Sequence, residues 1–379
     1  MIHRLTNPFP VVGYKGPEYF CDREEEIQQL RNAVISGRNS TLIALRRMGK
    51  TALIQHLFHT LEKDSYRLVY LDLMPTTSLH DLNSALVTAL ARAFPEKSST
   101  GKKIWQWIKS IRPTVTYDPY SGQPTVSVGF DKPEEQMVSI ADAFKLMDLN
   151  TNPTVVAFDE FQQITQYPEK QTEAWLRSQI QQLKNTTFVF SGSQQTILQE
   201  MFLSAKKPFY ASTELLQLDY IRFNTYRTFI SEKFNEAGRK IADEEITTIL
   251  NWCRGHTYYV QTICNRLFGR EQKEISPATV KAEMQQILKE QEGLFYTYRD
   301  LMTAPQWNLL KSIAKEDKLY APTSSVFISN YKLGPVATIQ RSLTSLLNNE
   351  LIFRVTDAEG TKYYQVYDVF LSRWLETSY

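Results

Sequence analysis

The sequence has few of the residues that build disulfide-linked or zinc-binding proteins. Its 379 residues include three cysteines, Cys21, Cys253 and Cys264, and none of them forms a C-x-x-C pair. An odd number of scattered thiols favours neither a disulfide framework nor a zinc site. His56 and His59 lie three residues apart, but no His-Glu-x-x-His pattern surrounds them. We therefore expect buried thiols and ordinary helix histidines.

The sequence also lacks a long apolar run and a strong charge of either sign. Its first residues have no apolar core of the kind that a signal peptide needs, and no later run is long enough to span a bilayer. The formal net charge of +2 excludes a wholly basic protein, so any nucleic-acid surface must be local. The composition, with 42% hydrophobic and 22% charged residues, predicts a globular cytoplasmic protein of two or three domains.

The most informative motif lies at residues 40–51, which read STLIALRRMGKT and precede apolar residues at helical spacing. Strand, turn and helix in this order predict a P-loop of the Walker A type, in which backbone N–H groups and the helix dipole bind phosphate. Lys50 would contact the β- and γ-phosphates of ATP, and the hydroxyl of Thr51 would bind Mg²⁺. The predicted nucleotide contacts here are Arg47, Met48, Gly49, Lys50, Thr51 and Ala52.

The motif departs from G-x-x-x-x-G-K-[ST] at one position, because Ala44 stands where the pattern has glycine. Alanine is the mildest replacement, although a positive φ there would strain it. The alternative interpretation is a strand-to-helix turn in which Gly-Lys-Thr occurs by chance. Arg46 and Arg47 can likewise be turn residues paired to acids.

A second motif follows at residues 154–161, which read TVVAFDEF. A continuous apolar run predicts a strand buried on both faces of a parallel sheet, with Asp159 and Glu160 at the carboxyl end, where α/β proteins bind ligands. This is a Walker B pattern, in which Asp159 completes the Mg²⁺ shell and Glu160 orients the attacking water. The alternative is an acidic pair that follows an unrelated strand.

Further strands of the same sheet are predicted at residues 66–73, 187–190 and 214–218. Ser193 and Gln194 follow the second of these and are candidates for sensing the γ-phosphate or its water, although each can equally be a helix cap. An insertion near residues 95–135 contains a predicted hairpin, whose simplest role is to cover a sheet edge. Asp22 and Glu25 predict a capped helix from Asp22 to near Gly37.

The remaining residues predict two helical modules. Residues 223–234, 243–252, 258–267 and 276–292 have the spacing of a helical bundle. Helices at 306–313 and 335–349, followed by a hairpin near 351–366, indicate a winged helix-turn-helix. The predicted architecture is an α/β P-loop NTPase core with a parallel sheet of the ASCE type, an N-terminal arm and the insertion (1–219), a helical lid (220–295) and a winged helix (296–379).

Together these motifs resemble the archaeal-type ATPase group of the STAND and AAA+-like P-loop NTPases. The resemblance rests on FCDREEEI at 20–27, RRMGKT at 46–51, FDEF at 158–161, SGS at 191–193, Gly255-His256, and Tyr367-Asp368. It implies that the turn at residues 20–24, with Arg23, and the lid turn at Gly255 and His256 enclose the adenine of ATP.

Two departures from this family pattern concern the nucleotide. Thr257 stands where the lid motif has proline, and Pro208-Phe209-Tyr210 is followed by Ala211 where similar proteins often have arginine. An arginine finger contributes about 10³ to 10⁵ in rate, so its absence predicts a slow basal ATPase unless Arg46, Arg47, Arg254 or a partner supplies the charge.

Three functions remain open at this point. The first is an Mg-ATP-dependent switch that acts on an unidentified protein partner, with a winged helix that docks on its own nucleotide domain. The second is a DNA-binding ATPase, although the expected recognition surface has few cations. The third is a nucleotide-binding scaffold with negligible turnover. The expected recognition surface consists of Thr338, Gln340, Arg341, Ser342, Thr344, Ser345 and Asn348, with Lys332, Arg354 and Lys362 nearby.

Overall fold

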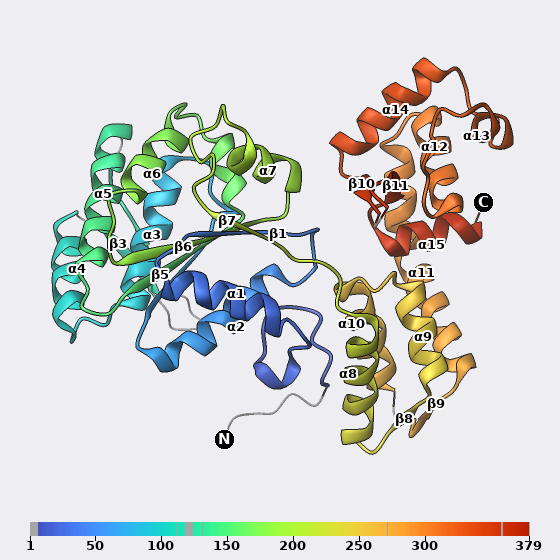
Figure 1. The fold of residues 1–379 in the computed structure, drawn as a ribbon, viewed down its shortest axis with the longest axis horizontal. Helices are drawn as coiled ribbons and strands as arrows, with labels where there is room; N and C mark the ends of the chain where they lie inside the picture. Colours follow the sequence, from blue (N-terminus) through green and yellow to red (C-terminus); the bar gives the residue numbers. More distant parts are fainter. Residues whose placement is uncertain are drawn as a thin grey trace. The chain divides into compact units, whose positions relative to one another are not determined.

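The computed structural model describes residues 7–111, 113–117, 124–130, 132–270, 272–357 and 359–378. They form two compact units (Figure 1). The first unit comprises residues 12–222, and the second comprises residues 223–378 together with residues 7–11. Within the part of the chain that is described, none of the helices has the length and apolar character needed to cross a membrane.

A five-stranded parallel sheet forms the centre of the first unit. The strands lie in the order β2-β5-β6-β1-β7, and every neighbouring pair is parallel. Because β6 lies between β1 and β5, the predicted α/β fold with an extra strand beside the P-loop strand is confirmed. The strands are β1 (Ser40–Ile43), β2 (Arg67–Asp72), β5 (Thr154–Asp159), β6 (Thr186–Gly192) and β7 (Glu214–Gln217).

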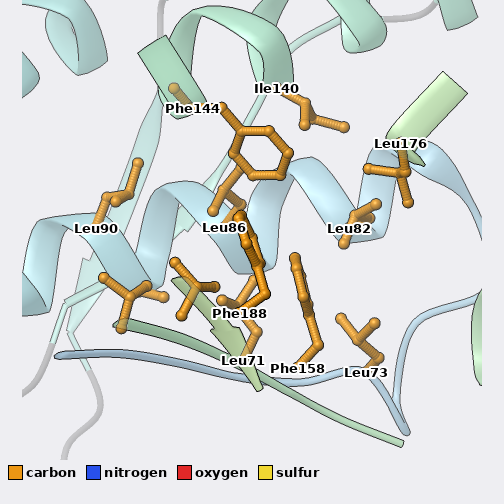
Figure 2. Packing of buried hydrophobic residues seen from close by; sticks show 14 of the residues in the cluster. Leu71, Leu73, Leu82, Leu86, Leu90, Ile140, Phe144, Phe158, Leu176 and Phe188 are labelled. Carbon is orange, nitrogen blue, oxygen red and sulfur yellow. The ribbon is translucent and has the colours of Figure 1, made fainter. Parts of the chain in front are cut away.

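Helices cover both faces of this sheet, and the apolar run of β5 contributes to both cores. Side chains alternate along a strand, so Val155 and Ala157 enter one core while Val156 and Phe158 enter the other. Figure 2 shows the second core, in which Leu86 lies over Phe158 and Phe188. The first face carries α1 (Glu24–Ile35) and α2 (Lys50–Leu61); the second carries α3 (Leu79–Ala93), α5 (Pro133–Asp148), α6 (Thr172–Ile180) and α7 (Gln195–Leu203).

The insertion contains the predicted hairpin but does not extend the sheet. Strands β3 (Thr114–Tyr117) and β4 (Pro124–Ser127) are antiparallel. Of the turn predicted at residues 118–124, residues 118–123 lie outside the described residues, and Pro124 begins β4. The hairpin packs on α3, where the hydroxyl of Thr88 accepts a hydrogen bond from the amide of Val126 (2.8 Å). Among the described residues, β3 and β4 pair only with each other, so they add no strand to the central sheet. Before them lies α4 (Ser99–Ser110).

The first helix begins differently from the predicted capping box. Helix α1 starts at Glu24, and its N-cap residue, Arg23, makes no side-chain cap. Asp22 and Arg23 both adopt left-handed conformations, with φ of 60° and 82°. Asp22 is therefore not the N-cap. Short 3-10 turns lie at η1 (Pro17–Tyr19), η2 (Glu62–Asp64) and η3 (Phe161–Gln166).

The second unit contains the predicted helical module and the module of helices followed by a hairpin. Phe9 is buried against Phe234 and Phe268, with ring centroids 5.4 and 5.9 Å apart, so this part of the N-terminal arm packs in the second unit. The first module comprises α8 (Phe223–Glu236), β8 (Lys240–Ile241), α9 (Asp243–Trp252), α10 (Thr257–Gly269), β9 (Glu274–Ile275) and α11 (Pro277–Asp300). The second comprises α12 (Ala304–Glu316), α13 (Ser325–Asn330), α14 (Val336–Asn348), β10 (Ile352–Thr356), β11 (Lys362–Val366) and α15 (Val369–Ser378).

Candidate active site

The loop between β1 and α2, residues 44–49, closes around the lysine that follows it. Lys50 Nζ donates to the carbonyl oxygens of Ala44 (3.3 Å) and Leu45 (3.2 Å), and its side chain is buried. Burial lowers the pKa of Lys50, whereas the nearby charges of Glu160 and Asp159 raise it. The ammonium group therefore lies within the loop, the place from which a P-loop lysine reaches phosphate oxygens.

The replacement of glycine by Ala44 causes no backbone strain. Ala44 is fully buried and is not among the described residues with a positive φ. The left-handed conformations fall instead on Arg47, with a φ of 62°, and on Gly49, with a φ of 95°. Gly49 is the N-cap of α2, where a β-carbon would be disfavoured. Met48 packs in the core beside Leu53, and Ala52 lies in the first turn of α2.

Asp159 is the centre of a hydrogen-bond cluster that joins three strands to α2. Its Oδ2 accepts from Thr51 Oγ1 (2.5 Å) and from the Tyr70 hydroxyl (2.9 Å). Its Oδ1 accepts from Ser191 Oγ and from the Glu160 amide (3.1 Å). Thr51 and Asp159, which are 108 positions apart in the sequence, are thus brought into direct contact, as the two motifs predicted.

Glu160 lies beside this cluster in a strained conformation, and one of its carboxylate oxygens accepts three hydrogen bonds. It has a φ of 55°, and its Oε2 accepts from the amide (3.0 Å) and hydroxyl (2.8 Å) of Ser193 and from Gln162 Nε2 (2.6 Å). The hydroxyl of Ser193 thus bonds to Glu160 and does not cap α7. Gln194 is the N-cap residue of that helix but makes no side-chain cap. Both sensor candidates therefore lie at the carboxyl end of β6, and Ser193 contacts the predicted catalytic acid.

A third carboxylate lies at the same edge of the sheet. Asp72 ends β2 directly beside Asp159 in the strand register. Burial raises the pKa of Asp72; the hydrogen bond from the Met74 amide opposes this, and the charges of Asp159 and Glu160 add to it. Burial also raises the pKa of Tyr70, and the charge of Asp159 raises it further, so this phenol stays a hydrogen-bond donor.

The cluster fits a phosphate-bound Mg²⁺ ion in its donor chemistry. Mg²⁺ prefers hard oxygen ligands and usually takes one or two from the protein, with the remainder from phosphate and water. A threonine hydroxyl and a carboxylate in contact supply such oxygens. Among the described residues there is no group of three or more His, Cys, Asp or Glu side chains that could hold a metal by itself. A Mg²⁺ ion that is bound partly by phosphate oxygens does not require such a group.

A cleft of about 630 Å³ opens beside the turn at residues 20–24, between α1 and α2. It is lined by Phe20, Arg23, Arg31 and His56 among others, and the rings of Phe20 and His56 stack at 4.3 Å. Arg23 is only 4% exposed, because its guanidinium donates to the Asp219 carbonyl (2.6 Å) and to Glu26 (2.8 Å). Arg23 therefore also joins α1 to the segment that follows β7.

The predicted lid turn lies in the second unit and has an unusual residue at its start. Helix α9 ends in a Schellman motif, in which the Arg254 amide donates to the Asn251 carbonyl and the Gly255 amide to the Leu250 carbonyl. Arg254 has a φ of 54° at the position where glycine is usual. His256 is 5% exposed, and its ring packs edge-on against Tyr259.

The Arg254 side chain joins this turn to the C-terminal module. Its guanidinium is paired with Asp317 (2.5 Å) and donates to Ser372 Oγ (2.8 Å) and to the Val366 carbonyl (3.2 Å). Nearby, Arg373 of α15 donates to the Trp252 carbonyl (2.9 Å). Since both terminal nitrogens of Arg254 are bonded inside its own unit and its Nε is buried, the structure argues against the sequence-based option that Arg254 supplies a transition-state charge.

The expected recognition helix, α14, exposes few cations. Gln340, Arg341 and Thr344 are exposed, and Arg341 is its one cationic side chain. Ser342 is 5% exposed, so its predicted place on the recognition surface is wrong: it lies on the inner face of the helix, between Ile339 and Leu346. On the wing, Arg354 and Lys362 are exposed.

Sequence reasoning missed three residues of the cluster around Asp159 and Glu160. Tyr70, Gln162 and Ser191 all donate to these carboxylates. A strand was predicted at residues 187–190, directly before Ser191, so the place of Ser191 beside Asp159 could have been found once the strand order was known. Tyr70 belongs to no motif, and no sequence signal relates it to Asp159.

Two families of known proteins match the chain. A family described as an ATPase domain predominantly from Archaea matches residues 20–263, and a probable winged helix domain matches residues 293–377. No curated protein matches the chain.

Solved structures of the same fold include two archaeal proteins. A Walker-type ATPase of Pyrococcus abyssi is 16% identical with a TM-score of 0.65, and the alignment covers 97% of this chain and 99% of that one. The ORC2 protein of Aeropyrum pernix, solved as ADPNP-ADP complexes, is 12% identical with a TM-score of 0.57, and the alignment covers 94% of each chain. Because the ATPase family match covers more than half of the sequence, the protein belongs to the family of ATPases found predominantly in Archaea.

Proposed function

We propose that the protein is a slow, Mg²⁺-dependent ATPase that acts as a nucleotide-controlled switch, as STAND proteins do. The observation that carries the proposal is the 2.5 Å contact between Thr51 Oγ1 and Asp159 Oδ2, with Glu160 next to it. A P-loop and a Walker B strand that meet in this way hold ATP and its metal ion at the carboxyl edge of the sheet.

In this proposal each residue of the cluster has a separate task. Lys50 leaves the loop carbonyls to bind the β- and γ-phosphates, while Thr51 and Asp159 hold Mg²⁺, which neutralises the phosphate charge. The remaining predicted contacts, Arg47, Met48, Gly49 and Ala52, border the phosphates through the loop and the first turn of α2.

Glu160 orients the attacking water and accepts its proton as the new P–O bond forms and the bond to the β-phosphate oxygen breaks. Ser193 holds Glu160 in place, and Gln194 lies beside it at the end of β6, where a γ-phosphate sensor is expected. This division of tasks predicts that changes at Glu160 affect turnover more than nucleotide binding.

Slow turnover follows from the missing arginine after Tyr210 and from the engagement of Arg254 with Asp317. Arg46 and Arg47 belong to the loop itself and remain the candidates within this chain for a transition-state charge. A protein partner that supplies an arginine is the other source, and would raise the rate by about 10³ or more.

The switch would operate through the lid turn and the winged helix. We propose that the cleft beside Phe20 and Arg23 and the lid turn at Gly255 and His256 enclose the adenine. Arg254 then transmits the position of that turn to the winged helix through Asp317 and Ser372. Of the predicted division into a core (1–219), a lid (220–295) and a winged helix (296–379), the proposal keeps the order of the three parts, but residues 7–11 pack with the second unit and the boundary after the core lies at residue 222. The lid and the winged helix move together.

DNA binding is the alternative function of the winged helix. Phosphate contacts supply most of the affinity of such modules, and α14 exposes one cationic side chain, Arg341. The observations therefore favour an intramolecular role or a protein partner over a duplex.

Phosphate release from Mg-ATP tests the proposal, with duplex DNA present or absent. We expect slow release that DNA does not change, its loss in Glu160→Gln with ATP binding retained, and loss of ATP binding in Lys50→Ala. Unchanged turnover in Glu160→Gln would refute its role. ATP binding without any turnover would favour a scaffold, and stimulation by DNA would favour the DNA-binding ATPase.

A further inference from the structure

Tyr70 is a half-buried tyrosine that no motif explains, and its hydroxyl bonds to the carboxylate at the centre of the candidate active site. Its hydroxyl donates to Asp159 Oδ2 at 2.9 Å. The same oxygen accepts from Thr51 Oγ1 at 2.5 Å, so one carboxylate oxygen receives two hydrogen bonds, one from β2 and one from α2. A tyrosine that serves only the core would not need this contact.

The strand register explains how this contact arises. Tyr70 on β2 lies opposite Ala157 on β5, two residues before the pair formed by Asp72 and Asp159. Residues two apart on a strand share a face, so Ala157 and Asp159 lie on the same face of β5. Tyr70 is paired with Ala157 and lies on that face too, which is the face that α2 covers. The long side chain of Tyr70 then extends along the strand to reach the carboxylate.

Ser191 completes the arrangement from the other side. The register of β5 with β6 pairs Phe158 with Phe190, so Ser191 lies level with Asp159, and its hydroxyl donates to Oδ1. Asp159 is only 3% exposed. Its two oxygens are therefore held by hydroxyl groups from both neighbouring strands, and the carboxylate plane cannot rotate without breaking these bonds.

We propose that Tyr70 is a positioning residue that fixes Asp159 Oδ2 beside Thr51, so that both oxygens are preorganised for the divalent ion of Mg-ATP. This inference rests on the proposed role of Asp159. Outer hydrogen bonds that orient metal ligands are worth about 10- to 100-fold in metal affinity. Since Thr51 and Ser191 still hold Asp159 when the phenol is removed, we expect an effect at the lower end of this range.

The test compares Tyr70→Phe with Asp159→Asn and with Tyr167→Phe. Tyr167 is a matched control, because its buried hydroxyl bonds to Thr76 Oγ1 (2.5 Å) and not to an active-site carboxylate. Two quantities are measured without turnover: the Mn²⁺ affinity of the nucleotide complex by electron paramagnetic resonance, and the affinity for a fluorescent ATP analogue in EDTA.

We expect Tyr70→Phe to weaken Mn²⁺ binding about 10-fold and to leave metal-free nucleotide binding unchanged. Tyr167→Phe should change neither quantity, and Asp159→Asn should weaken Mn²⁺ binding more than Tyr70→Phe does. Equal Mn²⁺ affinity in Tyr70→Phe and the parent protein would overturn the inference while leaving the proposed function intact. Equal affinity in Asp159→Asn as well would overturn the role of Asp159 itself.

Discussion

Replacing Arg254 with alanine should destabilise the second unit more than replacing an exposed arginine of the same unit does. Its side chain is 10% exposed, and the substitution removes the cation beside Asp317, which keeps its hydrogen bond from Gln365, and the Arg254 donors to Ser372 and to the Val366 carbonyl. Breaking a buried ion pair costs about 3–5 kcal/mol. Asp317 is 43% exposed and can regain water, so we expect a loss of about 3 kcal/mol at most.

A unit of this size loses about 2–4 °C in melting temperature for each kcal/mol. Calorimetry of the full chain should therefore show the transition of the second unit lowered in Arg254→Ala by several degrees, and by no more than about 6–12 °C. Arg341→Ala, which removes an exposed arginine of α14, is the control and should leave this transition unchanged.

A third variant separates the side chain from the backbone. Arg254→Gly also loses the ion pair, but glycine relieves the strain of the positive φ by about 1 kcal/mol. It should therefore be more stable than Arg254→Ala. If Arg254→Ala melts within about 1 °C of the parent protein, the bonds of Arg254 to Asp317, Ser372 and Val366 do not hold the lid turn to the C-terminal module.

Three further predictions concern the first unit. Gly192→Ala places a β-carbon 2.0 Å from Gln162 Oε1, so Gln162 must leave Glu160, and turnover should fall in a phosphate-release assay while ATP binding stays normal. Phe158→Ala empties the core beneath α3 and should cost about 3–5 kcal/mol in denaturant unfolding; a loss below 1 kcal/mol would contradict the packing. Burial and the nearby His59 lower the pKa of His56 from 6.5, so the folded protein disfavours its protonation. The protein should therefore lose stability as the pH falls below about 6.5, and urea titrations should show a smaller loss in His56→Gln.

The central strands could be predicted from the sequence because their apolar patterns are local. The run before Asp159 is buried on both faces, as a parallel central strand requires, and the contact of Asp159 with Thr51 follows from the two motifs. Helix α5 also has a local pattern, because Ile140, Phe144 and Met147 are buried at helical spacing. This helix was nevertheless not predicted from the sequence.

Other features depend on contacts that no local pattern encodes. The pair Asp22 and Glu25 has the spacing of a capping box, yet Arg23 sets the start of α1 through its bonds to Asp219 and Glu26. Tyr70 reaches Asp159 only because β2 and β5 are neighbours in a particular register. The role of Arg254 likewise requires the packing of α15 and β11 near the end of α9, which sequence spacing cannot give.

In the proposed switch, ATP and ADP set different arrangements of the two units. All three cysteines are buried, so spin labels can be directed to new exposed cysteines. Leu149→Cys in the first unit and Leu301→Cys in the second replace side chains that are 65% and 78% exposed.

Double electron–electron resonance would then compare the Mg-ATP and Mg-ADP states, with Glu160→Gln added to keep ATP intact. We predict two distinct distance distributions, one for each nucleotide, and a shift that Arg254→Ala weakens. The same distribution with ATP, with ADP and without nucleotide would contradict the account.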